Sequence, residues 1–188
     1  MANDDDAKSR GEPASAPRPS QVMERVIFGA GVVLRTWRRD DGPALELILE
    51  RSRQAFGDWL PGATKDLADI PAFLQHVEAA FADGTGFFYA LEEGGEALGQ
   101  CSLHHRAFRT GEIGYWVRTD RAGDGIASRA VNALVAAAYG EGLRELVIHC
   151  DEGNVRSAHV AANAGFIHVR TVQLDPTLPR TRAQRDAR

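Results

Sequence analysis

The sequence predicts an α/β domain, and three observations support this fold class. Two helical patterns come early in the chain, three strand-like segments joined by short turns follow, and strands and helices then alternate up to about residue 174. At 188 residues the chain is long enough for one domain with its own hydrophobic core.

The first half of the chain predicts one strand and two helices. Asp40 or Asp41 can cap the first helix, which carries Pro43 in its first turn. Its apolar residues recur at helical spacing. The predicted elements are a strand at 26–35, a helix from about 41 to 53, an aromatic loop at 56–61 and a helix at 69–82.

The second half predicts strands that alternate with two further helices. Gly94 and Gly95 predict the turn of a hairpin. The helix that begins at Gly125 has its apolar residues on one face, and Gly165 ends the last helix. The predicted strands are 86–91, 97–105, 111–117, 144–150 and 166–174, and the predicted helices are 125–140 and 154–163.

The two ends of the chain differ in composition from the part between them. Residues 1–20 are polar and contain three consecutive aspartates and three prolines, which predicts a disordered tail. Residues 176–188 are basic and predict a second disordered tail. The predicted folded domain is therefore 21–175.

Composition excludes several classes of protein. A net charge of −4 gives no basic surface for nucleic acid. The sequence has no run of about 20 apolar residues, so it predicts no membrane span. The polar N-terminus does not fit a signal peptide. Cys101 and Cys150 lie in apolar strand-like runs, which favours buried thiols in a reduced cytoplasm. The histidines show no metal-ligand spacing, so we expect no metal.

A glycine loop between a strand and an Ala-rich helix is the strongest single signal. Gly123 and Gly125 would let the backbone come close to an anion, whose charge the N-terminus of the helix favours. A P-loop would need a Gly-Lys-Ser/Thr ending that is absent. A dinucleotide fingerprint fits poorly, because Glu112, Tyr115 and Trp116 make the preceding strand polar and aromatic. An ordinary strand-to-helix turn stays an alternative.

Several motifs in order resemble one enzyme family. Residues 112–117 and 122–127 resemble the acetyl-CoA-binding segment of the GNAT acetyltransferase superfamily, in particular its RimJ/RimL-type ribosomal-protein N-terminal acetyltransferase branch. The Asn-x-x-Ser at 154–157, the Gly-Phe at 165–166 and residues 34–37 and 52–61 are similar to further signatures of that branch. The resemblance spans about residues 31–174.

This resemblance implies a GNAT fold, with a mixed central sheet and helices on both of its faces. The branch usually closes its sheet with one more apolar strand. Residues 176–188 contain Pro176, Pro179 and many arginines but no strand pattern, so we expect the last strand to be missing or atypical. A missing strand would expose a sheet edge, which a second subunit could cover as a homodimer.

The resemblance also implies a cofactor site for acetyl-CoA, which would be the co-substrate. The pantetheine arm would pair with backbone groups at the end of the 111–117 strand. The loop and the helix start would hold the pyrophosphate. The residues implied in cofactor binding are Trp116, Val117, Arg118, Gly123, Asp124, Gly125, Ile126, Ala127, Ser128 and Asn154.

Two residues of the loop depart from the family pattern. Ala122 stands where Gln or Arg is usual, and Asp124 places an acid where a basic or neutral residue is common. An acid beside a pyrophosphate weakens binding unless Arg121 or Arg129 offsets its charge.

Three residues are candidates for catalysis and acceptor binding, each with an alternative. Glu112 would be the general base, or would only orient the amine or pair with an arginine. Ser157 would donate to the leaving thiolate, or would only belong to a helix cap begun by Asn154. Trp59 would line the acceptor site, or would be a core residue.

The predicted reaction is direct transfer of an acetyl group to a primary amine. At pH 7, deprotonation costs about 1 kcal/mol for an α-amine and about 4.6 kcal/mol for a lysine. The sequence shows no strong base such as a paired His–Glu, so a protein N-terminal α-amine is the favoured acceptor. An aminoglycoside-type antibiotic is the alternative acceptor. A non-catalytic acyl-CoA-binding module, or a domain that binds nothing, are the other classes.

Overall fold

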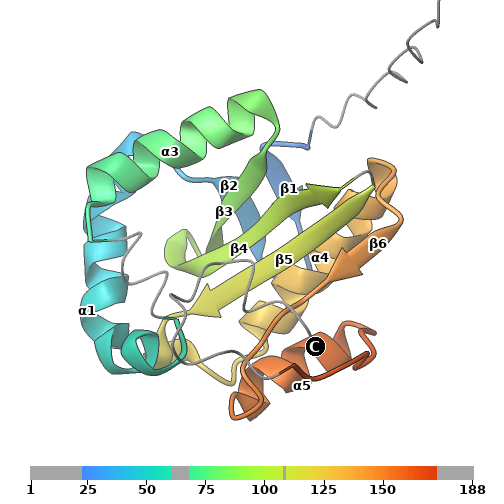
Figure 1. Cartoon of the computed structure of the whole chain (residues 1–188). Helices are drawn as coiled ribbons and strands as arrows, with labels where there is room; N and C mark the ends of the chain where they lie inside the picture. The colour runs from blue at the N-terminus through green and yellow to red at the C-terminus, as the bar shows by residue number, and fades with distance from the viewer. Residues whose placement is uncertain (1–22, 61–67, 108, 173–188) are drawn as a thin grey trace, which may run out of the picture.

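The computed structural model describes residues 23–60, 68–107 and 109–172. Within them lie six strands, four α-helices and two short 3-10 helices (Figure 1). The strands are β1 (Val26–Phe28), β2 (Val33–Thr36), β3 (Gly86–Glu93), β4 (Glu96–Ala107), β5 (Thr110–Val117) and β6 (Glu145–Val147). The helices are η1 (Arg39–Asp41), α1 (Gly42–Trp59), α3 (Ile70–Asp83), η2 (Thr119–Arg121), α4 (Ile126–Gly140) and α5 (Val155–Asn163).

The sheet is mixed, and its strands lie in chain order from β1 to β6. Each strand from β1 to β5 pairs with the next in antiparallel fashion, which short turns permit. Among the described strands, only β5 and β6 are parallel. Parallel neighbours need a crossover connection, and α4 supplies it. The predicted mixed sheet is confirmed.

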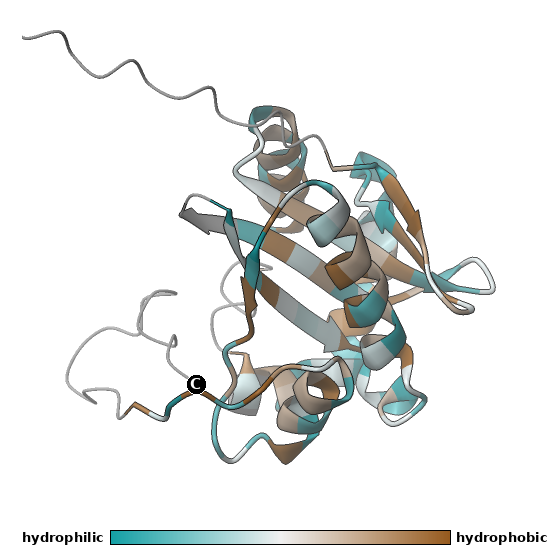
Figure 2. Ribbon diagram, turned by 90° about the vertical axis from the view of Figure 1, so that its right-hand side faces the viewer, coloured by the Kyte–Doolittle hydropathy of each residue, from teal (hydrophilic) through white to brown (hydrophobic). Residues whose placement is uncertain are grey.

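Each face of the sheet is covered by two helices. Side chains alternate between the faces of a strand, so β5 sends Ile113 to one hydrophobic cluster and Trp116 to the other. The cluster with Ile113 packs against α4 and α5, whereas the cluster with Trp116 packs against α1 and α3. Figure 1 shows α1 and α3 along one side of the sheet, and Figure 2 shows α4 lying across the strands.

Most predicted elements of the middle of the chain are confirmed, but the first strand is not continuous. It is a hairpin of β1 and β2, in which the Gly29 N–H donates to the Val32 carbonyl at 2.9 Å. Gly31 has a φ of 77°, a conformation that glycine adopts without steric cost. Because most residues of 26–35 are apolar, the sequence pattern predicted one continuous strand and not this turn.

The predicted aromatic loop at 56–61 is helical as far as Trp59, so this prediction was wrong in its described part. Phe56 is buried and its ring meets that of Trp116 edge-on, 5.2 Å between centroids. This contact extends α1 by about two turns beyond its predicted end. Residue 61 lies outside the described residues.

The predicted last strand is also wrong over residues 166–172, which form neither strand nor helix. Ile167 and Val169 are 82% and 76% exposed. A strand needs a partner, and β6 offers only three residues, shorter than the predicted 144–150. Residues 173 and 174, the tail at 1–20 and the tail at 176–188 lie outside the described residues. In the described part, no helix is long and apolar enough to cross a membrane.

Candidate active site

The parallel strands β5 and β6 pair over three residues and then separate. Their register runs from Thr110–Glu145 to Glu112–Val147, whereas β5 continues beside β4 to Val117. We call this separation the fork. Beyond Glu112, the edge of β5 that faces away from β4 is therefore not paired with β6.

The alternation of backbone groups shows which residues of β5 face the fork. The Arg118 N–H donates to the carbonyl of Leu98, a residue of β4, at 2.7 Å. Alternate residues of a strand direct their backbone groups to opposite edges, so Trp116 also points toward β4. Val117, Tyr115 and Ile113 then direct their N–H and C=O groups into the fork.

Two of the predicted cofactor residues, Trp116 and Arg118, have side chains that are buried and contact other residues of the protein. Trp116 is buried and stacks near Trp37, with ring centroids 6.5 Å apart. The Arg118 guanidinium is buried and contacts Glu96 and Asp120, each at 2.6 Å. Of the three residues predicted to pair with the pantetheine arm, only Val117 directs its backbone groups into the fork.

The glycine loop lies directly after β5 and ends where α4 begins. Gly123 and Gly125 have φ values of 103° and 74°, so side chains are disfavoured there. A Cβ built on either glycine would meet nothing within 4 Å, which leaves open space around the loop. The first intrahelical bond runs from the Arg129 N–H to the Gly125 carbonyl. The N–H groups of residues 126–128 precede it and have no partner within the helix.

The charges around this loop are balanced by ion pairs. Asp124 pairs with Arg121 at 2.7 Å, so one of the two arginines that could offset this acid contacts it. Glu93 receives a second bond from Arg121 and one from Arg129 at 2.8 Å. The hydrogen bonds from Arg129 and Arg121 lower the pKa of Glu93, which stays charged. Two arginines therefore face two carboxylates. Sequence spacing gave no signal for Glu93, which comes from the distant β3–β4 hairpin.

At the start of the fork, Glu112 lies beside an imidazole. The His149 Nδ1 is 3.3 Å from Glu112 Oε1, and both side chains are largely buried. His149 follows β6 and lies two residues beyond Val147, the register partner of Glu112. The expectation that the chain lacks a paired His and Glu was therefore wrong. The pairing depends on the parallel register of β5 and β6, which the sequence did not reveal.

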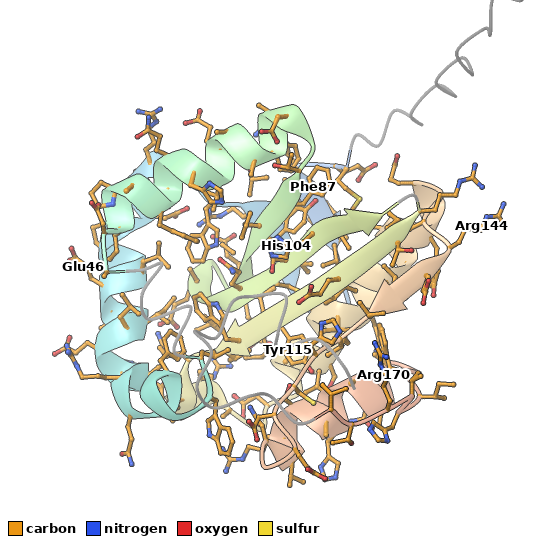
Figure 3. The ribbon with its side chains drawn as sticks, in the orientation of Figure 1. Glu46, Phe87, His104, Tyr115, Arg144 and Arg170 are labelled. Atoms are coloured by element: carbon orange, nitrogen blue, oxygen red, sulfur yellow. The ribbon has the colours of Figure 1, made fainter. Side chains whose placement is uncertain are left out.

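Across the fork, the start of α5 is bonded to β5. The Tyr115 hydroxyl donates to the Ser157 carbonyl at 2.8 Å and lies 3.0 Å from Ser157 Oγ. Burial raises the pKa of Tyr115 to about 12, so this hydroxyl keeps its proton at neutral pH. The Asn154 side chain accepts from the Ser157 N–H at 3.1 Å, which confirms the helix cap. Figure 3 shows Tyr115 between β5 and α5.

Trp59 connects the end of α1 to the loop before α5. Its side chain is 42% exposed, so it is not a core residue. A Cβ built on Gly153 would lie 3.4 Å from the Trp59 ring. The indole therefore reaches from the helix layer of one face to the segment that precedes Asn154.

Comparison with known proteins agrees with this geometry. Residues 32–167 match the family described as acetyltransferase (GNAT) domain. The chain belongs to the GNAT acetyltransferase family. The predicted fold and the predicted class of enzyme, an acyl-CoA-dependent N-acetyltransferase, are confirmed with it.

Relatives in this family support the predicted RimJ/RimL-type branch. The chain is 28% identical over 142 residues to YdaF of Bacillus subtilis, described as a ribosomal N-acetyltransferase, with 72% of this chain and 78% of the relative covered. It is 46% identical over 61 residues to the ribosomal-protein-serine acetyltransferase of Escherichia coli, which covers 31% of this chain and 34% of that protein. The structure of Mycobacterium smegmatis RimJ with CoA-disulfide is 26% identical, with a TM-score of 0.64, covering 73% of this chain and 70% of that one.

Replacing Gly125 by Trp should block the loop. The new side chain would fill the open space and disfavour the positive φ, so we expect acetyl-CoA affinity to fall at least about tenfold, or about 1.4 kcal/mol. Isothermal titration calorimetry measures this change. Gly84→Trp is the matched control, because Gly84 has a φ of 72° and equally open surroundings but ends α3. Equal affinities for wild type and Gly125→Trp would contradict the assignment of this loop.

Proposed function

We propose that this chain transfers the acetyl group of acetyl-CoA to the α-amine of a protein N-terminus. The observation that carries the proposal is the open edge of β5, which leads from Glu112 at one end to the glycine loop at the other. Such an edge suits an extended ligand that pairs like an added strand. The loop at its end suits a pyrophosphate.

The donor side uses mostly backbone groups. Val117 and Tyr115 would pair with the amide groups of the pantetheine arm, and Gly123–Ser128 would surround the pyrophosphate. Arg121 and Arg129 already have carboxylate partners, so the net charge of the loop is close to neutral. The helix N-terminus and its N–H groups then provide most of the attraction for the anion.

The chemistry needs a proton acceptor on one side of the thioester and a proton donor on the other. Glu112 takes one proton from the acceptor ammonium, and the amine lone pair attacks the thioester carbonyl carbon. The second proton passes from the nitrogen to solvent when the carbon–sulfur bond breaks. The hydroxyl pair of Ser157 and Tyr115 supplies one proton to the thiolate and regains it from solvent. The overall reaction of an ammonium therefore releases one proton.

The acceptor side is bounded by Glu112 and by Trp59, which reaches from α1 to the segment before α5. The names of the relatives support a ribosomal-protein acceptor. An α-amine is also the acceptor that loses its proton most easily near pH 7. Glu46, an exposed acid of α1, lies on the outer side of that helix (Figure 3).

We infer a bacterial cytoplasmic setting from the bacterial relatives and from two cysteines that form no disulfide with each other. The described sheet ends at β6, so a second copy of the chain is our candidate cover for that edge.

Thiol release from acetyl-CoA tests the proposed acceptor. We expect turnover with short peptides that begin with Ser or Ala, and none with the same peptides after their α-amine is blocked. Aminoglycosides serve as the competing acceptor. Turnover with aminoglycosides but not with peptides would show that the acceptor is a small molecule and not a protein N-terminus. Acetyl-CoA binding without turnover on any amine would favour a non-catalytic module.

Ser157→Ala and Tyr115→Phe should each lower kcat, because each removes one hydroxyl from the pair that protonates the thiolate. General-acid contributions of about 100-fold or more are usual. We expect the Kd of acetyl-CoA to change less than about threefold, since the affinity comes from backbone groups. Stopped-flow thiol detection and calorimetry measure the two quantities. An unchanged kcat in both variants would leave these residues with only their role in joining α5 to β5.

A further inference from the structure

His149 contacts Glu112. His149 comes just after β6, whereas Glu112 lies in β5. Their contact joins Nδ1 to Oε1 at 3.3 Å, within ion-pair distance. The two side chains are 12% and 15% exposed, so they are shielded from bulk water without being sealed from it. Neither side chain belongs to the two hydrophobic clusters of the described residues.

The direction of the His149 side chain follows from the strand pattern. Leu146 and Ile148 are buried in the cluster that packs against α4. Alternation then places Val147 and His149 on the opposite face, the face of Glu112. Alternation places Cys150 on the first face, the face of Tyr115. His149 therefore faces the proposed proton acceptor, while its neighbour faces the proposed proton donor.

We propose that His149 is a positioning residue that acts through Glu112 and holds the proton taken from the acceptor amine. This inference rests on the proposed function and deepens it. Glu112 receives the proton from the ammonium and passes it to the imidazole. The products of this transfer are an imidazolium and a carboxylate 3.3 Å apart, and opposite charges at this distance stabilise each other. No atom is gained or lost beyond the proton that the ammonium gives up.

The consequence is a base that is better matched to neutral pH than a carboxylate alone. A glutamate has a reference pKa of about 4.3 and a histidine of about 6.5. General bases are most effective when they titrate near the working pH. With His149 in place, the proton rests on a group that holds it about 100-fold more strongly than glutamate does.

A second imidazole lies near Glu112 on the same face. His104 of β4 is the register partner of Glu112 and is visible on β4 in Figure 3. Its Nε2 lies 3.2 Å from Ser102 Oγ, and its ring meets that of Phe88 at 4.7 Å. In β5 and β6 themselves, the other described side chains of this face are Thr110, Trp116, Val147 and Glu145. Of these only Glu145 carries a charge, and it lies at the exposed end of the pairing, where the Thr110 hydroxyl donates to it at 3.4 Å. Any test of His149 must therefore also compare His104.

The test is the pH dependence of kcat for His149→Gln at saturating acetyl-CoA and peptide. We expect kcat at pH 7 to fall by about 10- to 100-fold with an unchanged Kd for acetyl-CoA. The acid limb of the profile should move to lower pH by about two units, because a carboxylate then holds the proton alone. The double variant with Glu112→Gln should be no slower than Glu112→Gln by itself, since His149 acts through Glu112.

His159→Gln, an exposed histidine of α5, is the matched control and should leave kcat and the acid limb unchanged. A wild-type profile in His149→Gln would overturn the inference. So would an acid limb that moves in His104→Gln instead, or losses that multiply in the double variant. If the wild-type chain transfers acetyl to no amine, the proposed function fails; if wild type turns over and His149→Gln matches it, only the role of His149 fails.

Discussion

The separation of β5 from β6 after Glu112 is the constraint on which the rest of the site depends. Three parallel pairs hold the two strands together at one end, and the Tyr115–Ser157 bonds hold α5 against β5 at the other. Among the described residues, the outer edge of β5 beyond Glu112 pairs with no other strand as far as Val117. The same divergence brings His149 beside Glu112 and the start of α5 beside Tyr115, so one backbone feature positions both the proposed proton acceptor and the proposed proton donor.

The loop after β5, our proposed anion site, offers little uncompensated side-chain charge. Arg121 and Arg129 are both engaged by carboxylates, and Asp124 is neutralised within the loop. The positive φ values of Gly123 and Gly125 leave the N-terminus of α4 open to solvent. Arg129 also donates to the Ala30 carbonyl at 2.9 Å, so it joins the loop to the β1–β2 hairpin as well as to Glu93. In this arrangement the arginines are held by carboxylates, and in the proposed site the backbone would attract the anion.

The sequence predicted what local patterns determine and missed what distant pairing determines. The glycine loop, the Asn154 cap and the β3–β4 turn each follow from a few adjacent residues, and all three are confirmed. The Glu112–His149 contact and the Glu93–arginine pairs join residues far apart in the chain, so only the register of the sheet reveals them. The end of α1 at Trp59 and the absence of a strand over 166–172 likewise depend on packing partners that a local pattern does not show. The cofactor, catalytic and acceptor roles of the site residues stay predictions.

Hydrogen exchange with and without acetyl-CoA tests the central claim most directly, because it reports on backbone amides. Bound acetyl-CoA should slow exchange in peptides that cover residues 113–117 and 123–128, while peptides from β1, β2 and α3 exchange as before. This result would place the ligand along the open edge of β5 and at the start of α4. Slowed exchange confined to other elements, with residues 113–128 unaffected by saturating acetyl-CoA, would contradict the account.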